Sequence, residues 1–171
     1  MSALPPQLQR LADGVGQAVT LAPEAMASEV RLALHAATAE SGWLPPERRR
    51  ASHENYARHL IYTDPGGRFS ILALIWDRGQ VSPIHAHHCW CAVGVYRGLL
   101  TETYYRAGTD GTPPVETGSA RHAVGESTFD ASGEGIHRIG NYSGVLAISL
   151  HVYGVAGDRI ATHVNRLYPT A

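Results

Sequence analysis

Residues 79–98 read GQVSPIHAHHCWCAVGVYRG and contain two histidines, His85 and His87, that are separated by one residue. Short apolar stretches bounded by Gly, Pro, Asn and Asp surround this segment, which indicates β-strands. Side chains two residues apart on a strand point to the same face, so both imidazoles are expected on one side. Two neutral imidazoles placed in this way can bind a divalent metal ion. Solvent-exposed strands also produce this pattern, so the segment alone does not identify a metal site.

A second histidine segment follows fifty residues after His87, beyond a group of turn residues and at the start of another predicted strand. It reads Gly135-Ile-His137-Arg-Ile-Gly-Asn141. Together the two segments resemble the two sequence motifs of the cupin superfamily. The positions that match the motif spacing are Gly79, His85, His87 and Gly98 in the first segment, and His137 and Asn141 in the second.

The resemblance implies a double-stranded β-helix, or jelly-roll barrel, with a metal ion bound by His85, His87 and His137. Two positions depart from the motifs, since Cys91 stands where the first motif has Glu and the Pro of the second motif is absent. The alternative is an unrelated barrel whose core histidines are satisfied by ordinary hydrogen bonds.

The cysteine in the glutamate position makes the sequence similar to one cupin family, the cysteine dioxygenase family of thiol dioxygenases. Three further stretches between residues 53 and 155 resemble that family. Tyr56-Ala-Arg58 is similar to its substrate-binding Tyr-x-Arg, and residues 68–79 are similar to the strand and turn before its first metal motif. Ser149-Leu-His151-Val-Tyr153 matches its Ser-x-His-x-Tyr.

This resemblance implies a non-haem Fe(II) enzyme that adds both atoms of O₂ to the sulfur of a small thiol and forms a sulfinic acid. Arg58 is expected to bind a substrate carboxylate, because a guanidinium pairs with a carboxylate through two hydrogen bonds. Tyr56 would help to place the substrate. Arg159 or Arg166 would supply a second anion contact for a dicarboxylate.

The sequence leaves the identity of the thiol open. Arg58 favours a substrate of the L-cysteine type. The spacing between His87 and Gly98 instead resembles that of bacterial relatives that prefer 3-mercaptopropionate.

Residues 146–153 alternate between apolar side chains and a second set that includes Ser149, His151 and Tyr153. Periodicity alone allows this second face to lie in solvent. The resemblance implies that it points into the barrel, with Tyr153 contacting O₂ or substrate, His151 orienting Tyr153 and Ser149 orienting His151. It also implies a thioether between Cys91 and Tyr153; the alternative is that Cys91 merely fills space.

Two other classes of function remain open at this point. One is a different metal-dependent cupin enzyme, such as an isomerase or a dioxygenase that cleaves a carbon–carbon bond. The other is a non-catalytic cupin that binds a small ligand or a metal ion.

The pattern along the chain predicts a mainly β protein with N-terminal helices. We expect one cupin domain over residues 1–171, consisting of a helical extension (1–50), a β-barrel core (53–155) and a C-terminal tail (156–171). The predicted strands are residues 56–62, 69–76, 81–87, 90–96, 99–105, 126–130, 136–140 and 145–154.

The composition of the chain excludes several classes of function. The chain has 171 residues with a formal net charge of −1, which suits one domain and argues against a nucleic-acid partner. All 14 basic residues are arginine, which excludes a Schiff-base or P-loop lysine.

The sequence shows no secretory signal and no apolar run long enough to span a membrane, so a cytoplasmic protein is expected. Cys89 and Cys91 are two residues apart, and on a strand this puts their Cα atoms about 6.6 Å apart, near the upper limit for a disulfide. A disulfide is therefore not expected, which favours a reducing compartment. The expected partners are a small thiol and O₂, and the expected state is a monomer or a small homo-oligomer.

Overall fold

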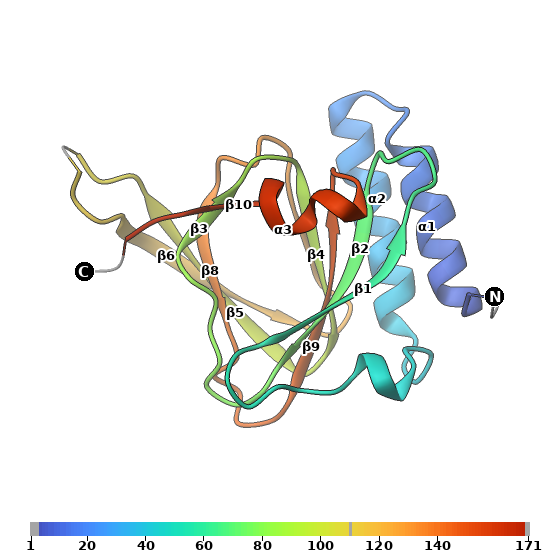
Figure 1. The fold of residues 1–171 in the computed structure, drawn as a ribbon, viewed down its shortest axis with the longest axis horizontal. Coiled ribbons are helices and arrows are strands. Elements are labelled where there is room, and N and C mark those ends of the chain that lie inside the picture. The colour runs from blue at the N-terminus through green and yellow to red at the C-terminus, as the bar shows by residue number, and fades with distance from the viewer. Residues whose placement is uncertain (1–3, 110, 170–171) are drawn as a thin grey trace.

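The computed structural model describes residues 4–109 and 111–169 as two helices packed against a barrel of two antiparallel sheets (Figure 1). One sheet has the strand order β1-β2-β9-β4-β7 and the other has the order β10-β3-β8-β5-β6. The helices are α1 (Pro6–Ala18), α2 (Pro23–Ala39) and the short α3 (Ile160–His163). The strands are β1 (Ala57–Thr63), β2 (Ser70–Trp76), β3 (His85–His87), β4 (Cys91–Arg97), β5 (Leu99–Arg106), β6 (Val115–Ala123), β7 (Ser127–Asp130), β8 (Ile136–Gly140), β9 (Ala147–Tyr153) and β10 (Asn165–Leu167).

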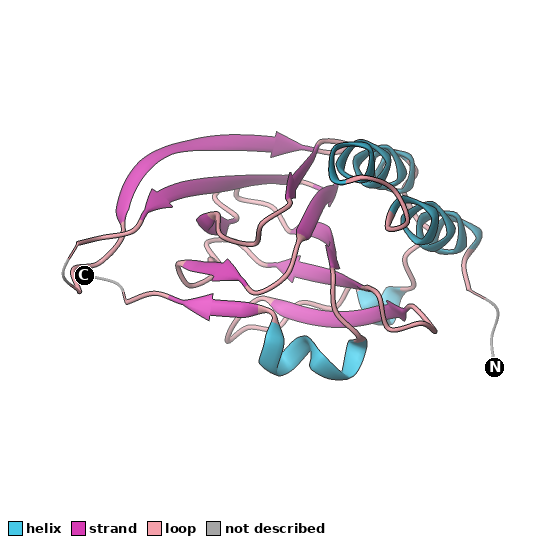
Figure 2. Cartoon of the chain, turned by 90° about the horizontal axis from the view of Figure 1, so that it is seen from above, coloured by secondary structure: helices cyan, strands magenta, loops and turns pink. Residues whose placement is uncertain are grey.

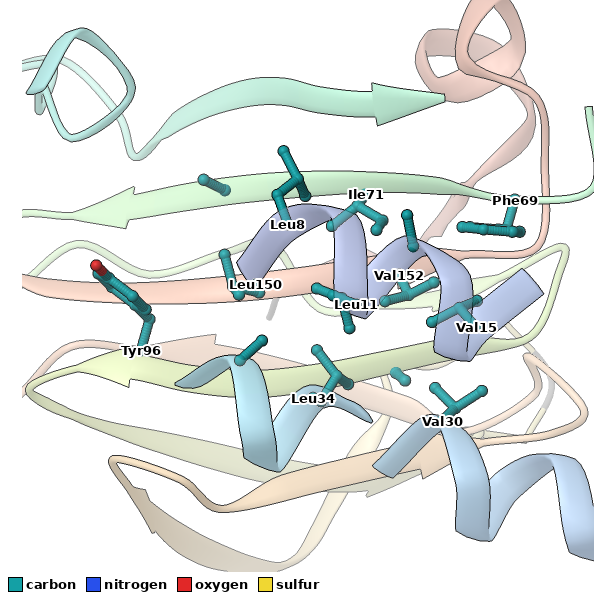
Figure 3. Packing of buried hydrophobic residues seen from close by; sticks show 14 of the residues in the cluster. Leu8, Leu11, Val15, Val30, Leu34, Phe69, Ile71, Tyr96, Leu150 and Val152 are labelled. Carbon is teal, nitrogen blue, oxygen red and sulfur yellow. The ribbon is translucent and has the colours of Figure 1, made fainter. Parts of the chain in front are cut away.

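Helices α1 and α2 lie side by side at one edge of the molecule, where they cover one sheet (Figure 2). Pro6 and Pro23 each stand in the first turn of their helix, a position at which proline has no hydrogen bond to lose. The apolar faces of the helices meet the outward side chains of β2 and β9 in one cluster, part of which is drawn in Figure 3. The cluster includes Leu8, Leu11, Val15, Val30, Leu34, Ile71, Leu150 and Val152.

Helix α2 packs closely against the sheet at Gly94 of β4. A β-carbon at this position would lie 3.3 Å from Leu34 Cβ and from Thr38 Cγ2 of α2. A larger residue would therefore push α2 away from the sheet. Because α2 covers the outer face, the opposite face of the same strands is left to line the barrel.

Strand β9 is buried along its whole length, so both of its alternating faces are covered. Ile148, Leu150 and Val152 face the helices, whereas Tyr153 belongs to the cluster inside the barrel. Ser149 and His151 lie on the same inner face and are 0% and 3% exposed. The alternative that this polar face lies in solvent is therefore excluded.

The fold prediction of a mainly β protein with N-terminal helices is confirmed, but two strands were not predicted. Strand β6 is polar and mostly exposed, so it lacks an alternating apolar pattern, and it forms by pairing with β5. Strand β10 falls within residues 156–171 and pairs with β3. The predicted strand 81–87 is shorter than expected, because Pro83 cannot donate a ladder hydrogen bond.

Candidate metal centre

Three histidines meet where β3 pairs with β8 inside the barrel. His85 lies directly opposite His137, and His87 follows two residues later on the same face of β3. All three side chains are buried, and their ligand atoms lie within 4.8 Å of one another. The Nε2 atoms of His87 and His137 are 3.1 Å apart. The three histidines expected to bind metal are thus brought together.

The donor set fits a divalent metal ion. Burial, together with the neighbouring imidazoles, lowers the pKa of His85 to about 3 and that of His87 to about 4. Both rings are therefore neutral at physiological pH, which is the form that binds a metal ion. Two metal–nitrogen bonds of about 2.1 Å at a right angle place the nitrogens about 3 Å apart, close to the separation of His87 and His137.

Glu102 of β5 is a buried carboxylate that the sequence reasoning missed. It lies diagonally across from His137 in the β5–β8 ladder, and its Oε1 accepts a hydrogen bond from His137 Nδ1 at 2.5 Å. Its Oε2 accepts hydrogen bonds from His122 Nε2 at 3.1 Å and from the Tyr104 hydroxyl at 3.0 Å. Burial raises the pKa of Glu102, but the hydrogen bonds from His122 and His137 outweigh this effect and hold that pKa well below its usual range.

The Glu102 contact fixes the orientation of His137. With its proton on Nδ1, the ring presents a bare Nε2 to the other two histidines, and a carboxylate partner makes that nitrogen a stronger donor. The one available signal in the sequence was the alternation of Leu100, Glu102 and Tyr104, which puts a lone acid on the inward side of a strand.

The other two histidines have weaker partners. His85 Nδ1 donates to the backbone carbonyl of Pro83 at 2.9 Å. His87 Nδ1 is buried without a hydrogen-bond partner among the residues that the structure describes, and so is Oδ1 of Asn165, its register partner on β10. Asn141, the other matched motif residue, donates to the backbone carbonyls of Trp76 and Val145 and therefore has a structural contact.

The inner face of β9 carries a chain of hydrogen bonds that ends beside the histidines. Trp76 Nε1 donates to Ser149 Oγ at 2.9 Å, Ser149 Oγ bonds His151 Nε2 at 2.9 Å, and His151 Nδ1 bonds the Tyr153 hydroxyl at 3.0 Å. The rings of Tyr153 and His87 meet edge to face with centroids 5.5 Å apart. When His151 carries its proton on Nδ1, the Tyr153 hydroxyl keeps its own proton for another acceptor.

Cys91 and Tyr153 are directly opposed on β4 and β9, and both belong to the inner cluster. Such pairs have β-carbons about 4.5–5.5 Å apart, so their side chains are neighbours. Cys91 is a free thiol, and burial raises its pKa well above the usual value. Burial likewise raises the pKa of Tyr153, which keeps the phenol protonated.

Tyr56 and Arg58 approach from the β1 edge of the same sheet. The Tyr56 ring stacks on Trp76 with centroids 4.3 Å apart. Arg58 is opposite Leu74 of β2, an inner-face residue, and its side chain is exposed. Burial raises the pKa of Tyr56, and the positive charge of Arg58 partly opposes this shift, which places the guanidinium near the phenol.

The expected second anion contact from Arg166 does not fit the structure. Arg166 pairs with Ala86, so it lies on the face of the β3–β10 ladder away from His85 and His87. Its guanidinium instead covers the Tyr168 ring at 5.7 Å. Arg159 is exposed at the end of a short 3₁₀ turn.

Comparison with known proteins agrees with this geometry. The family profile described as "Cysteine dioxygenase type I" matches residues 33–166. The chain belongs to the cysteine dioxygenase type I family. The match begins in the second half of α2, covers the barrel and ends within β10, so it includes every residue of the centre described above.

Solved structures support the cupin fold of this cysteine dioxygenase family member. A Klebsiella pneumoniae protein with a double-stranded β-helix domain is 17% identical with a TM-score of 0.51, covering 72% of this chain and 93% of that one. A cupin 2 conserved barrel domain protein from Rhodopseudomonas palustris is 21% identical with a TM-score of 0.50, covering 71% and 74%. The oxalate decarboxylase of Lactobacillus farciminis is 11% identical with a TM-score of 0.51, covering 68% and 32%.

No helix in the described part of the chain is long and apolar enough to cross a membrane.

Replacing Glu102 with Gln should weaken metal binding by about ten- to hundredfold, because outer partners of ligating histidines typically contribute that much. Anaerobic calorimetric titration of the apo-protein with Fe(II) measures the change. Glu116→Gln, which removes an exposed carboxylate on neighbouring β6, is the matched control and should bind as the wild type does. Equal affinity in the Glu102 and Glu116 variants would show that the Glu102 contact does not support the centre.

Proposed function

We propose that this protein is a non-haem Fe(II) thiol dioxygenase that converts a small carboxylate-bearing thiol into its sulfinic acid. The observation that carries the proposal is the position of the Ser149–His151–Tyr153 chain beside three converging imidazoles. Membership in the cysteine dioxygenase type I family supports the same chemistry. His85, His87 and His137 would hold the iron.

The reaction balances without a further reductant. The thiol and O₂ together contain all the atoms of the sulfinic acid, since both oxygens become bonded to sulfur and the O–O bond breaks. Sulfur loses four electrons and O₂ gains them. Bound Fe(II) supplies the positive charge that lowers the pKa of the thiol and the redox chemistry that O₂ requires.

Tyr153 would act as a hydrogen-bond donor to O₂ or to the substrate. Its raised pKa keeps the hydroxyl protonated at neutral pH, and the bond to His151 Nδ1 fixes the direction of the hydroxyl. Ser149 holds the other ring nitrogen of His151, and Trp76 holds Ser149. A donor fixed in this way does not have to reorganise when charge develops on the oxygen atoms.

Arg58 would bind the substrate carboxylate. Among the described residues, no hydrogen bond or ion pair engages its guanidinium, which leaves the planar fork free for a two-point contact. Tyr56, fixed by stacking on Trp76, forms the neighbouring wall. Thiols of the L-cysteine and 3-mercaptopropionate types both carry the carboxylate that this contact requires.

The test of this proposal is O₂ uptake by the Fe(II) protein with L-cysteine, 3-mercaptopropionate, mercaptosuccinate and cysteamine. At least one carboxylate-bearing thiol should raise O₂ consumption above the thiol-free rate and yield a sulfinic acid. Arg58→Ala should lower kcat/KM for that thiol by about ten- to hundredfold, because a charge-assisted hydrogen bond is worth about 1.5–3 kcal/mol.

Cysteamine, which lacks a carboxylate, is the substrate control and should be little affected by the Arg58 change. Arg121→Ala on exposed β6 is the control variant and should match the wild type. An equal loss with cysteamine would contradict the carboxylate contact. A failure of every thiol to raise O₂ consumption would contradict the proposed activity itself.

We also propose that Cys91 and Tyr153 become joined by a thioether. The Sγ–carbon bond replaces the S–H bond of Cys91 and a ring C–H bond of Tyr153, and O₂ is the oxidant that accepts the two hydrogens with their electrons. Intact-mass measurement of the iron-loaded protein after turnover should therefore show the loss of two hydrogen atoms.

The two neighbouring cysteines provide a matched pair of variants. Cys91→Ala should abolish the mass loss, whereas Cys89→Ala should retain it, because Cys89 is not paired with Tyr153. An unchanged mass of the wild type after turnover with thiol and O₂ would disprove the crosslink.

A further inference from the structure

A cavity of about 180 Å³ lies beside two of the three histidines, His87 and His137. Its lining continues to Tyr104 and Gly135, both of which are exposed, so the cavity connects the buried histidines to the surface. Arg58, Tyr56 and the Ser149–His151–Tyr153 chain are not among the residues that line it. The cavity therefore reaches the centre from a different side.

The walls of the cavity are mainly apolar. Val93 of β4 and Thr128 of β7 are register partners and form one side, with Cys91 next to them. Burial raises the pKa of the Cys91 thiol, so this thiol contributes no charge.

The two acids in the lining are already saturated with donors. Glu102 accepts three hydrogen bonds, as described above, and Asp130 accepts the backbone N–H groups of Ser132, Gly133 and Gly135. The two carboxylates therefore do not require a hydrogen-bond donor from a ligand, but their negative charges repel an anion. A carboxylate-bearing thiol is therefore disfavoured here and favoured at Arg58.

We propose that this cavity is the route by which dioxygen reaches the centre, separate from the side on which the thiol carboxylate binds. The inference rests on the proposed thiol dioxygenase function. Dioxygen is small, uncharged and apolar, and an apolar cavity of about 150 Å³ already accepts molecules as large as benzene. With two separate routes, a thiol bound at the Arg58 side does not block the entry of O₂.

Xenon is a suitable probe because it enters small apolar protein cavities. In crystals of the wild-type protein under xenon pressure, we expect xenon next to Val93 and Thr128. Thr128→Phe should fill this space, exclude xenon and raise KM for O₂ severalfold while KM for the thiol stays unchanged. Thr103→Phe makes the same substitution on β5 at a half-buried position outside the cavity lining and should leave both constants unchanged.

Val93→Phe fills the cavity from the opposite strand and provides a second variant if Thr128→Phe does not fold. A wild-type cavity without xenon would overturn the inference, as would a filled cavity that raises KM for the thiol instead of KM for O₂. A wild-type protein that consumes no O₂ with any thiol yet binds xenon would overturn the proposed function instead.

Discussion

The pairing of β3 with β8 is the constraint on which the centre depends. It sets His85 opposite His137 and brings His87 onto the same face, so three imidazoles share one buried volume. Burial and the neighbouring imidazoles favour the neutral forms of His85 and His87, and buried polar atoms without partners are costly. A metal ion is the partner that satisfies all three together.

The surrounding strands provide each ligand with a different environment. Glu102 of β5 gives His137 a carboxylate, the backbone at Pro83 gives His85 a carbonyl, and β10 places Asn165 next to His87. Among the described residues, His137 Nδ1 thus has a charged partner, His85 Nδ1 has a neutral one and His87 Nδ1 has none, so the three imidazoles are not equivalent.

The helices contribute indirectly to the chemistry. By covering the outer faces of β2 and β9, α1 and α2 bury Leu150 and Val152 and fix the register of the strand. With this register, the opposite face of β9 places His151 and Tyr153 inside the barrel. A one-residue slip would exchange the two faces and expose the apolar side chains. The N-terminal extension is thus part of what positions the hydrogen-bond chain.

The three histidines and the inward direction of the polar face of β9 could be predicted because the sequence resembles the motifs of a known family, whereas spacing and alternation alone left both open. Glu102 was missed because alternation puts an acid on the inward side of its strand but cannot show its contact, which depends on how β5 is registered against β8. Strand β10 was missed for the same reason, since Asn165 meets His87 only through a pairing between distant segments. The short alternation of Arg166 and Asn165 also could not show that Arg166 faces away from the centre.

Native mass spectrometry of the protein after anaerobic loading with Fe(II) tests the metal centre directly. We expect one iron per wild-type chain and none in His137→Ala, while His88→Ala, which alters an exposed neighbour of His87, should still bind one. Retention of iron by the His137 variant at the wild-type level would contradict the claim that the three converging histidines form the metal centre.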